Sequence, residues 1–181
     1  MKMKSRLRSC ALAMTPCALL LAAAPTRAQD KKFGFYAGYE YFHSNDGNLN
    51  GLRLSPEYRL NGAVSLVGDF SADFGKLAST DTTLTTVLGG LRARMSIGSA
   101  AIYVHGLAGG VRASSSITPF QGVSISVADT GLGLDGGGGL EFKLSRLRMR
   151  IGADYLRREV DIGGGKTAKE DDIRATVGFV F

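Results

Sequence analysis

The sequence predicts an all-β protein, folded as an eight-stranded antiparallel up-and-down barrel. From Phe33 onward, apolar and polar residues alternate with a period of two in segments of about ten residues, the pattern of half-buried strands. Turn-forming clusters separate these segments. All 25 glycines lie after residue 33, and glycine disfavours helices. An even number of short, consecutive strands can close into a barrel without free edges.

The alternation is clearest in the last segment, 173–181, where the odd positions are apolar and the even positions are mostly polar or glycine. In the segments 82–95 and 100–113 it is less regular, and their facing is left open. The remaining predicted strands are 33–41, 52–60, 64–74, 132–144 and 147–156.

The connections alternate between short and long. The sequence predicts tight turns at 60–63, 96–100 and 145–146, and longer polar loops at 44–49, 75–81, 114–126 and 159–171. Asn61-Gly62 predicts a two-residue hairpin turn, since both residues tolerate positive φ. Short turns therefore gather on one rim and long loops on the other.

The first residues have the composition of a secretion signal. Four basic residues fall within the first eight, no charge occurs over 11–24, and small residues stand at Thr26 and Ala28. The uncharged stretch is shorter than the roughly 20 apolar residues of a membrane-spanning helix. We expect 1–28 to be a signal peptide that is removed, and 29–181 to be one barrel domain.

Charge and cysteine content change once the signal is set aside. The full chain has a net charge of +6, but the signal contains five basic residues and no acidic one, which leaves 17 basic and 16 acidic residues. This balance excludes a nucleic-acid-binding protein. Cys10 and Cys17 both lie in the signal, so the mature chain has no disulfide and no thiol nucleophile.

The direction of the apolar face decides between two classes of barrel. With the apolar face inward, the protein would be a soluble periplasmic carrier; with it outward, the lumen must hold charges of both signs, which can pair. The final strand ends on Phe181, which suits a lipid-facing strand better than a soluble one. We therefore predict an eight-stranded antiparallel up-and-down transmembrane β-barrel. Its predicted interior charges are Glu40, Arg53, Glu57, Arg59, Asp69, Asp73, Asp135, Glu141, Lys143, Arg148, Arg150, Asp154 and Arg174.

Residues 33–181 resemble the bacterial outer-membrane β-barrel superfamily and are similar to OmpA-like transmembrane domains. The resemblance depends on the terminal segment 177–181 and on the glycine-rich strand that leads to Phe142. It implies export to the outer membrane, contact with outer-membrane lipid and a monomeric barrel. It also implies that Phe179 and Phe181 form the signal read by the barrel-assembly machinery. Pro56 departs from the strand pattern, and we expect a bulge there.

Two glycine-rich motifs resemble nucleotide-binding loops but lack the required context. Residues 131–136 match the dinucleotide fingerprint, yet they open a strand where the motif needs a following helix. Residues 163–167 resemble a phosphate-binding loop, but Val160 stands where its first glycine is required. We expect no nucleotide cofactor.

The two histidines, His43 and His105, do not form a recognisable metal motif, and a zinc site would need carboxylates from elsewhere. His43 and Ser44 are adjacent on a strand and should face opposite sides, so they are poorly placed as base and nucleophile. We expect no cofactor, no metal and no enzyme activity.

Eight strands enclose a lumen that side chains just fill. The leading hypothesis is therefore a structural or interaction role with a charged interior and surface-exposed loops. The alternatives are a minor ion or small-solute channel, a lipid-modifying outer-membrane enzyme and the soluble carrier.

Overall fold

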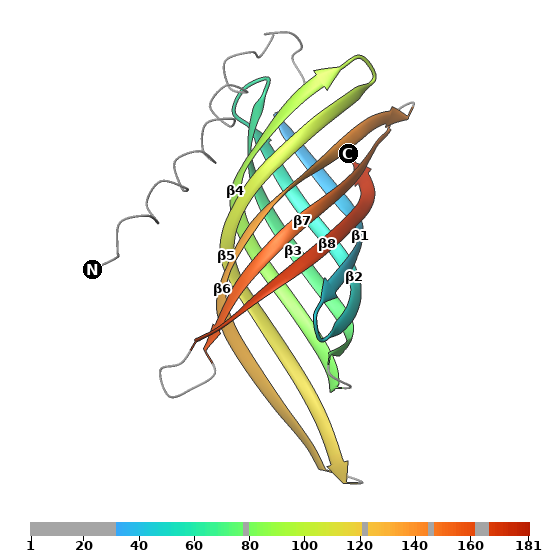
Figure 1. The fold of residues 1–181 in the computed structure, drawn as a ribbon. Helices are drawn as coiled ribbons and strands as arrows, with labels where there is room; N and C mark the ends of the chain where they lie inside the picture. The colour runs from blue at the N-terminus through green and yellow to red at the C-terminus, as the bar shows by residue number, and fades with distance from the viewer. Residues whose placement is uncertain (1–31, 78–79, 121–122, 145–146, 162–166) are drawn as a thin grey trace, which may run out of the picture.

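The computed structural model describes residues 32–77, 80–120, 123–144, 147–161 and 167–181, and the predicted signal peptide 1–28 lies outside them. The strands form one closed antiparallel barrel in chain order, so the predicted fold class is confirmed (Figure 1). Within the described residues, no helix is long and apolar enough to cross a membrane. The strands are β1 (Phe33–Ser44), β2 (Gly47–Arg59), β3 (Val64–Leu77), β4 (Thr80–Ile97), β5 (Ala100–Phe120), β6 (Val123–Leu144), β7 (Leu147–Asp161) and β8 (Thr167–Val180).

The strands continue into the segments predicted as long loops. The predicted loop 44–49 is a hairpin in which Ser44 pairs with Gly47, and 114–126 is mostly paired β5–β6 backbone. The loops predicted at 75–81 and 159–171 are likewise shortened by pairing up to Leu77 and from Thr167. The prediction was wrong because hydrophobic alternation is needed only where one face meets lipid. Beyond the bilayer both faces can be wet, and polar residues pair equally well.

Two of the three turns predicted on the opposite rim, at 60–63 and 96–100, form where they were predicted, with one difference in turn type. Gly98 adopts φ 63° between β4 and β5, as a tight turn requires. At 60–63, Gly62 is not among the glycines with positive φ, so the predicted turn type was wrong. Instead, the Asn61 side chain accepts hydrogen bonds from the backbone N–H groups of Ala63 (2.9 Å) and Val64 (2.8 Å). The predicted turn at 145–146 lies outside the described residues.

The predicted bulge at Pro56 is absent from the register. Leu54 pairs with Phe70 and Glu57 with Val67, so β2 and β3 keep one register across the proline. Only the ladder bonds at Pro56 and its neighbour are interrupted. A missing N–H therefore weakens the pairing there without inserting an extra residue.

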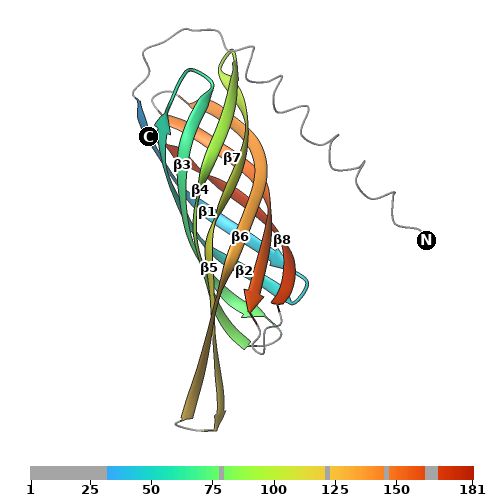
Figure 2. The ribbon, with the colours of Figure 1, turned by 90° about the vertical axis from the view of Figure 1, so that its left-hand side faces the viewer.

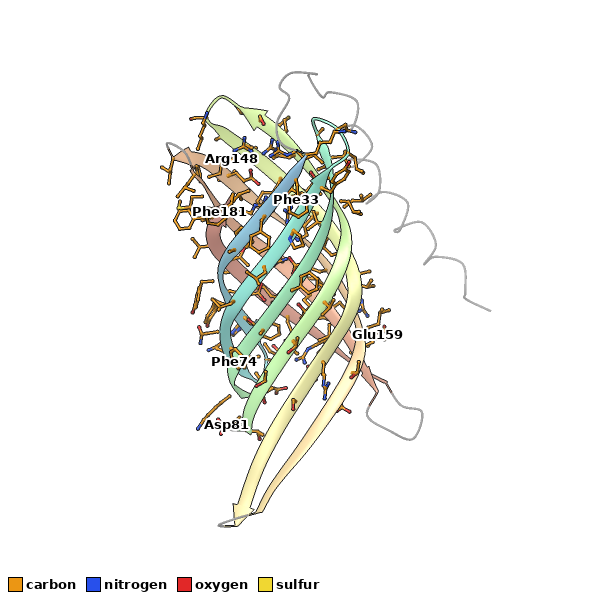
Figure 3. The ribbon with its side chains drawn as sticks, turned by 180° about the vertical axis from the view of Figure 1, so that it is seen from behind. Phe33, Phe74, Asp81, Arg148, Glu159 and Phe181 are labelled. Atoms are coloured by element: carbon orange, nitrogen blue, oxygen red, sulfur yellow. The ribbon has the colours of Figure 1, made fainter. Side chains whose placement is uncertain are left out.

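The barrel is apolar on its outer surface (Figure 3). On β8, Ile173 is 57% exposed while the neighbouring Arg174 is completely buried, and the same alternation holds along the other strands. This arrangement reverses that of a soluble barrel and excludes the soluble carrier. Backbone bonds between Phe35 and Phe181 tie the two ends of the barrel together on the rim that carries the short turns. In outer-membrane barrels, short turns lie on the periplasmic side.

Candidate functional site: the charged lumen

The structure buries ten of the thirteen predicted interior charges. These ten side chains point into the lumen and are at most 5% exposed: Glu40, Arg53, Glu57, Asp69, Asp73, Asp135, Glu141, Arg150, Asp154 and Arg174. The other three lie at the mouth that carries the short turns, where Arg59 and Arg148 are half-buried and Lys143 is exposed. The interior position predicted for Lys143 was wrong, because β6 extends past the lumen at that end.

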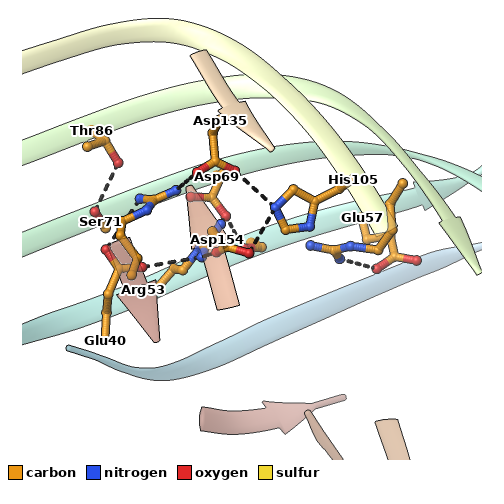
Figure 4. Close-up of polar contacts among 12 residues, drawn as sticks. Glu40, Arg53, Glu57, Asp69, Ser71, Thr86, His105, Asp135 and Asp154 are labelled. Carbon is orange, nitrogen blue, oxygen red and sulfur yellow. Dashed lines mark hydrogen bonds and ion pairs between the residues drawn. The ribbon is translucent and has the colours of Figure 1, made fainter. Parts of the chain in front are cut away.

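A central cluster fills the middle of the lumen (Figure 4), and its members come from seven strands. Arg53 donates from Nε to Asp69 Oδ2 (2.7 Å) and pairs through Nη1 with Asp154 and with Glu40 Oε2 (3.3 Å). Arg174 bonds to Glu40 Oε1 (3.3 Å) and to Asp135. We define the central cluster as Glu40, Arg53, Asp69, Asp73, His105, Asp135, Asp154 and Arg174.

A second cluster lies between the first and the mouth that carries the short turns. Arg150 bridges Glu57 Oε2 (3.1 Å) and Glu141 Oε1 (2.5 Å). Arg92 donates to the same Glu57 oxygen at 2.8 Å, and Arg94 lies 3.3 Å from Glu141 Oε2. Charges of opposite sign therefore meet across the barrel from four strands, which offsets much of the cost of burying them.

Aromatic rings connect the two clusters. The Arg150 guanidinium lies 5.1 Å from the Tyr36 ring centroid and 5.0 Å from that of Tyr103. Arg92 lies 5.1 Å from the Tyr103 ring, which in turn stacks on His105 at 5.9 Å. Cation–π contacts of this kind are strongest when they are desolvated. The lumen is thus one continuous packed network rather than a set of separate ion pairs.

Two features of the lumen were missed from the sequence. One is a set of buried charged or titratable side chains, Arg92, His105, Arg158 and Asp172. Arg92 and His105 lie on the segments whose facing was left open. The other is an apolar cluster inside the barrel, formed by Phe42, Leu49, Val67, Leu84, Leu88, Leu107, Val111 and Leu156.

His43 and Ser44 are placed as the alternation requires. His43 is exposed on the outer face, where its Nδ1 lies 2.6 Å from Asn48 Oδ1, and Ser44 is buried. The imidazole and the hydroxyl are on opposite faces of β1, so they do not form the hydrogen-bonded pair that nucleophilic catalysis needs.

An apolar outer face around a paired, charged lumen defines a β-barrel of the bacterial outer-membrane type. Comparison with known protein families supports this class. The chain belongs to the family described as outer membrane protein beta-barrel domain, whose model matches residues 14–181. No protein of curated function matches it.

Three solved structures share the fold. Neisserial surface protein A has a TM-score of 0.67 at 18% identity, with 83% of this chain and 96% of that one covered. Ail, the attachment invasion locus protein of Yersinia pestis, has a TM-score of 0.57 at 20% identity, covering 82% and 96%. The N-terminal β-barrel domain of Pseudomonas aeruginosa OprF has a TM-score of 0.55 at 16% identity, covering 84% and 100%. At these identities the likeness establishes the fold alone.

Proposed function

We propose that this protein is a non-conducting outer-membrane barrel that presents the β5–β6 hairpin at the cell surface to an extended segment of a partner protein. The projecting hairpin carries the proposal. β5 has 21 residues and β6 has 22, whereas β1 has 12, and the hairpin extends well past the other strand ends (Figures 1 and 2).

One edge of this hairpin is free for pairing. β6 pairs with β5 from Val123 onward, but its pairing with β7 begins only at Gly131. Within the described residues, the β6 edge over 123–130 therefore has no neighbouring strand on the β7 side. Unpaired N–H and C=O groups on a strand edge are a template for a further strand. Asp129, at the barrel end of this edge, is its only charged residue, so the outer part over 123–128 has no charge that would block such pairing.

The closed lumen supports the non-conducting part of the proposal. Eight strands leave little more space than side chains fill, and here two ion-pair clusters and an apolar cluster occupy it. The hairpin lies on the rim opposite the short turns (Figure 1), and in outer-membrane barrels the short turns lie on the periplasmic side. After export through the predicted signal peptide, the hairpin would therefore face the exterior. We propose no catalytic role, since the described residues bring no base onto the Ser44 hydroxyl.

A shortened hairpin tests the proposal. Ser114 and Ala128 pair directly, so replacing residues 115–127 by Asn-Gly joins them through a two-residue turn. Outside the hairpin, the change removes the pairing of Ser115 and Ser116 with the outer end of β4. Ten-residue random peptides displayed on phage are selected on the wild-type barrel in detergent and then measured on the shortened one. A heat-shifted band on an unboiled gel confirms that both proteins are folded.

The selected peptides should lose at least about tenfold in affinity for the shortened barrel, a difference of about 1.4 kcal/mol. Their backbone N-methylated forms should lose binding to the wild type, because methylation removes the donors that a strand edge requires. Equal binding to both barrels would remove the hairpin from the function. Binding that survives N-methylation would reject strand pairing.

A further inference from the structure

We propose that the central cluster binds one divalent transition-metal ion, zinc by the chemistry of its donors, between His105, Asp135 and Asp154. Their donor atoms, one imidazole nitrogen and two carboxylate oxygens, lie within 4.8 Å of one another. The three side chains are at most 1% exposed. Imidazole and carboxylate are both zinc ligands, and three protein ligands leave a fourth position for water.

The hydrogen bonding around His105 leaves one buried oxygen unsatisfied. His105 Nε2 lies 2.9 Å from Asp135 Oδ1 and 3.2 Å from Asp154 Oδ1 (Figure 4). One ring nitrogen carries at most one hydrogen. It bonds to Asp135, and Asp154 Oδ1 has no hydrogen-bond partner although the residue is only 3% exposed. A buried carboxylate oxygen without a hydrogen-bond partner is costly. A metal ion would bind His105 Nε2 and the Oδ1 atoms of Asp135 and Asp154 at the same time.

The remaining oxygens of both carboxylates are already held. Arg174 bonds to Asp135 Oδ2 and Arg53 bonds to Asp154 Oδ2, which leaves the Oδ1 atom of each carboxylate directed at His105. Outer partners of this kind orient metal ligands and are a regular part of metal sites. The arrangement is therefore rigid before any ion binds.

The backbone provides the space. Gly137 on β6 pairs with His105 on one side and with Asp154 on the other. A Cβ at Gly137 would come within 2.1 Å of Asp154 Oδ1. The absence of a side chain there lets the imidazole and the carboxylate meet above the strand.

The distances suit zinc. Tetrahedral zinc bonds nitrogen and oxygen at about 2.0–2.2 Å, which separates neighbouring ligand atoms by roughly 3.3–3.6 Å. The observed distances of 2.9 Å and 3.2 Å from His105 Nε2 need only small adjustments.

The charge of the cluster favours a cation. Five carboxylates face only Arg53 and Arg174 as permanent cations, and uncompensated charge is expensive in a desolvated lumen. A divalent ion removes most of that excess. Because the ligands are buried, we expect the ion to enter while the barrel folds, so that metal binding is coupled to folding.

The test uses the other histidine as a matched control. Wild-type, His105→Gln and His43→Ala proteins are unfolded in chelator, refolded into detergent with Zn²⁺ or Co²⁺, and washed with chelator. Heat-shifted bands confirm folding. Elemental mass spectrometry then gives the metal content per barrel, and the visible spectrum of Co²⁺ reports its coordination.

Wild-type and His43→Ala barrels should each retain about one ion per chain, with the intense absorption of tetrahedral Co²⁺. His105→Gln should retain none, and Asp154→Asn should bind at least about tenfold more weakly. No retained metal in a folded wild-type barrel would overturn the proposal, as would equal retention by His105→Gln. NMR in excess zinc provides a further check. If both nitrogens of the His105 ring carry a proton, the imidazole binds no metal ion, and the proposal is overturned.

Discussion

Replacing Arg53 by methionine tests how dry the lumen is. Arg53 is 3% exposed and contacts three carboxylates, Asp69 at 2.7 Å, Glu40 at 3.3 Å and Asp154. Methionine keeps much of the volume but leaves those carboxylates without their shared cation. Breaking a buried pair in this way costs about 3–5 kcal/mol, or roughly a hundredfold to a few thousandfold in the folding equilibrium.

A surface pair provides the control. Arg157 Nε lies 4.0 Å from Asp171, and the two side chains are 47% and 54% exposed. Because water screens such a pair, Arg157→Met should cost less than about 1 kcal/mol. The double variant Arg53→Met/Asp69→Asn should recover part of the loss, because it also removes one of the orphaned charges.

The assay is urea unfolding in phospholipid vesicles, followed by tyrosine fluorescence and by the heat-shifted band, since the chain has no tryptophan. An Arg53→Met barrel as stable as the Arg157→Met barrel would refute the reasoning. It would mean that water fills the lumen and screens the cluster, and a conducting lumen would then have to be considered again.

Three further predictions concern packing, assembly and conductance. Gly152→Val should abolish the heat-shifted band, because a Cβ there would lie 2.1 Å from Tyr103 Oη, whereas Gly136→Val should fold normally, since no atom lies within 4 Å of its Cβ. Phe181→Ser should lower the amount of barrel in the outer membrane of cells without slowing refolding into detergent; an equal defect in both would contradict a role in assembly. Wild-type and Arg150→Ala barrels should both be silent in planar bilayers, and stepwise currents in either would contradict the closed lumen.

The membrane-embedded part of each strand could be predicted from the sequence because lipid demands apolar residues on one face. The alternation over 173–181, for example, agrees with the burial along β8. The outer parts of β5 and β6 could not be predicted, because no solvent boundary constrains their side chains there. The outer parts of these strands are held by backbone pairing, and backbone pairing leaves little pattern in the amino-acid sequence.

The contents of the lumen were only partly predictable for a different reason. Local alternation shows which residues share a face, but it does not show which inward residues meet across the barrel. His105, Asp135 and Asp154 come from β5, β6 and β7, and only the register brings them together around Gly137. Leu84 and Leu88 face inward against the polar trend, because the lumen contains an apolar cluster as well as charges.

The β1–β8 seam determines how the barrel can close. Its ladder extends from Tyr36 to His43, with two further backbone bonds between Phe35 and Phe181, and is shorter than that of any other pair of neighbouring strands in the described chain. Glu40 and Arg174 bridge this short ladder from within. Pairing of the last strand with the first therefore also transfers the Arg174 guanidinium from water to a site among carboxylates. Closure of the barrel therefore depends on side chains of opposite charge in the lumen as well as on backbone pairing. The short β1–β8 ladder is stabilised from inside by Arg174, which is completely buried.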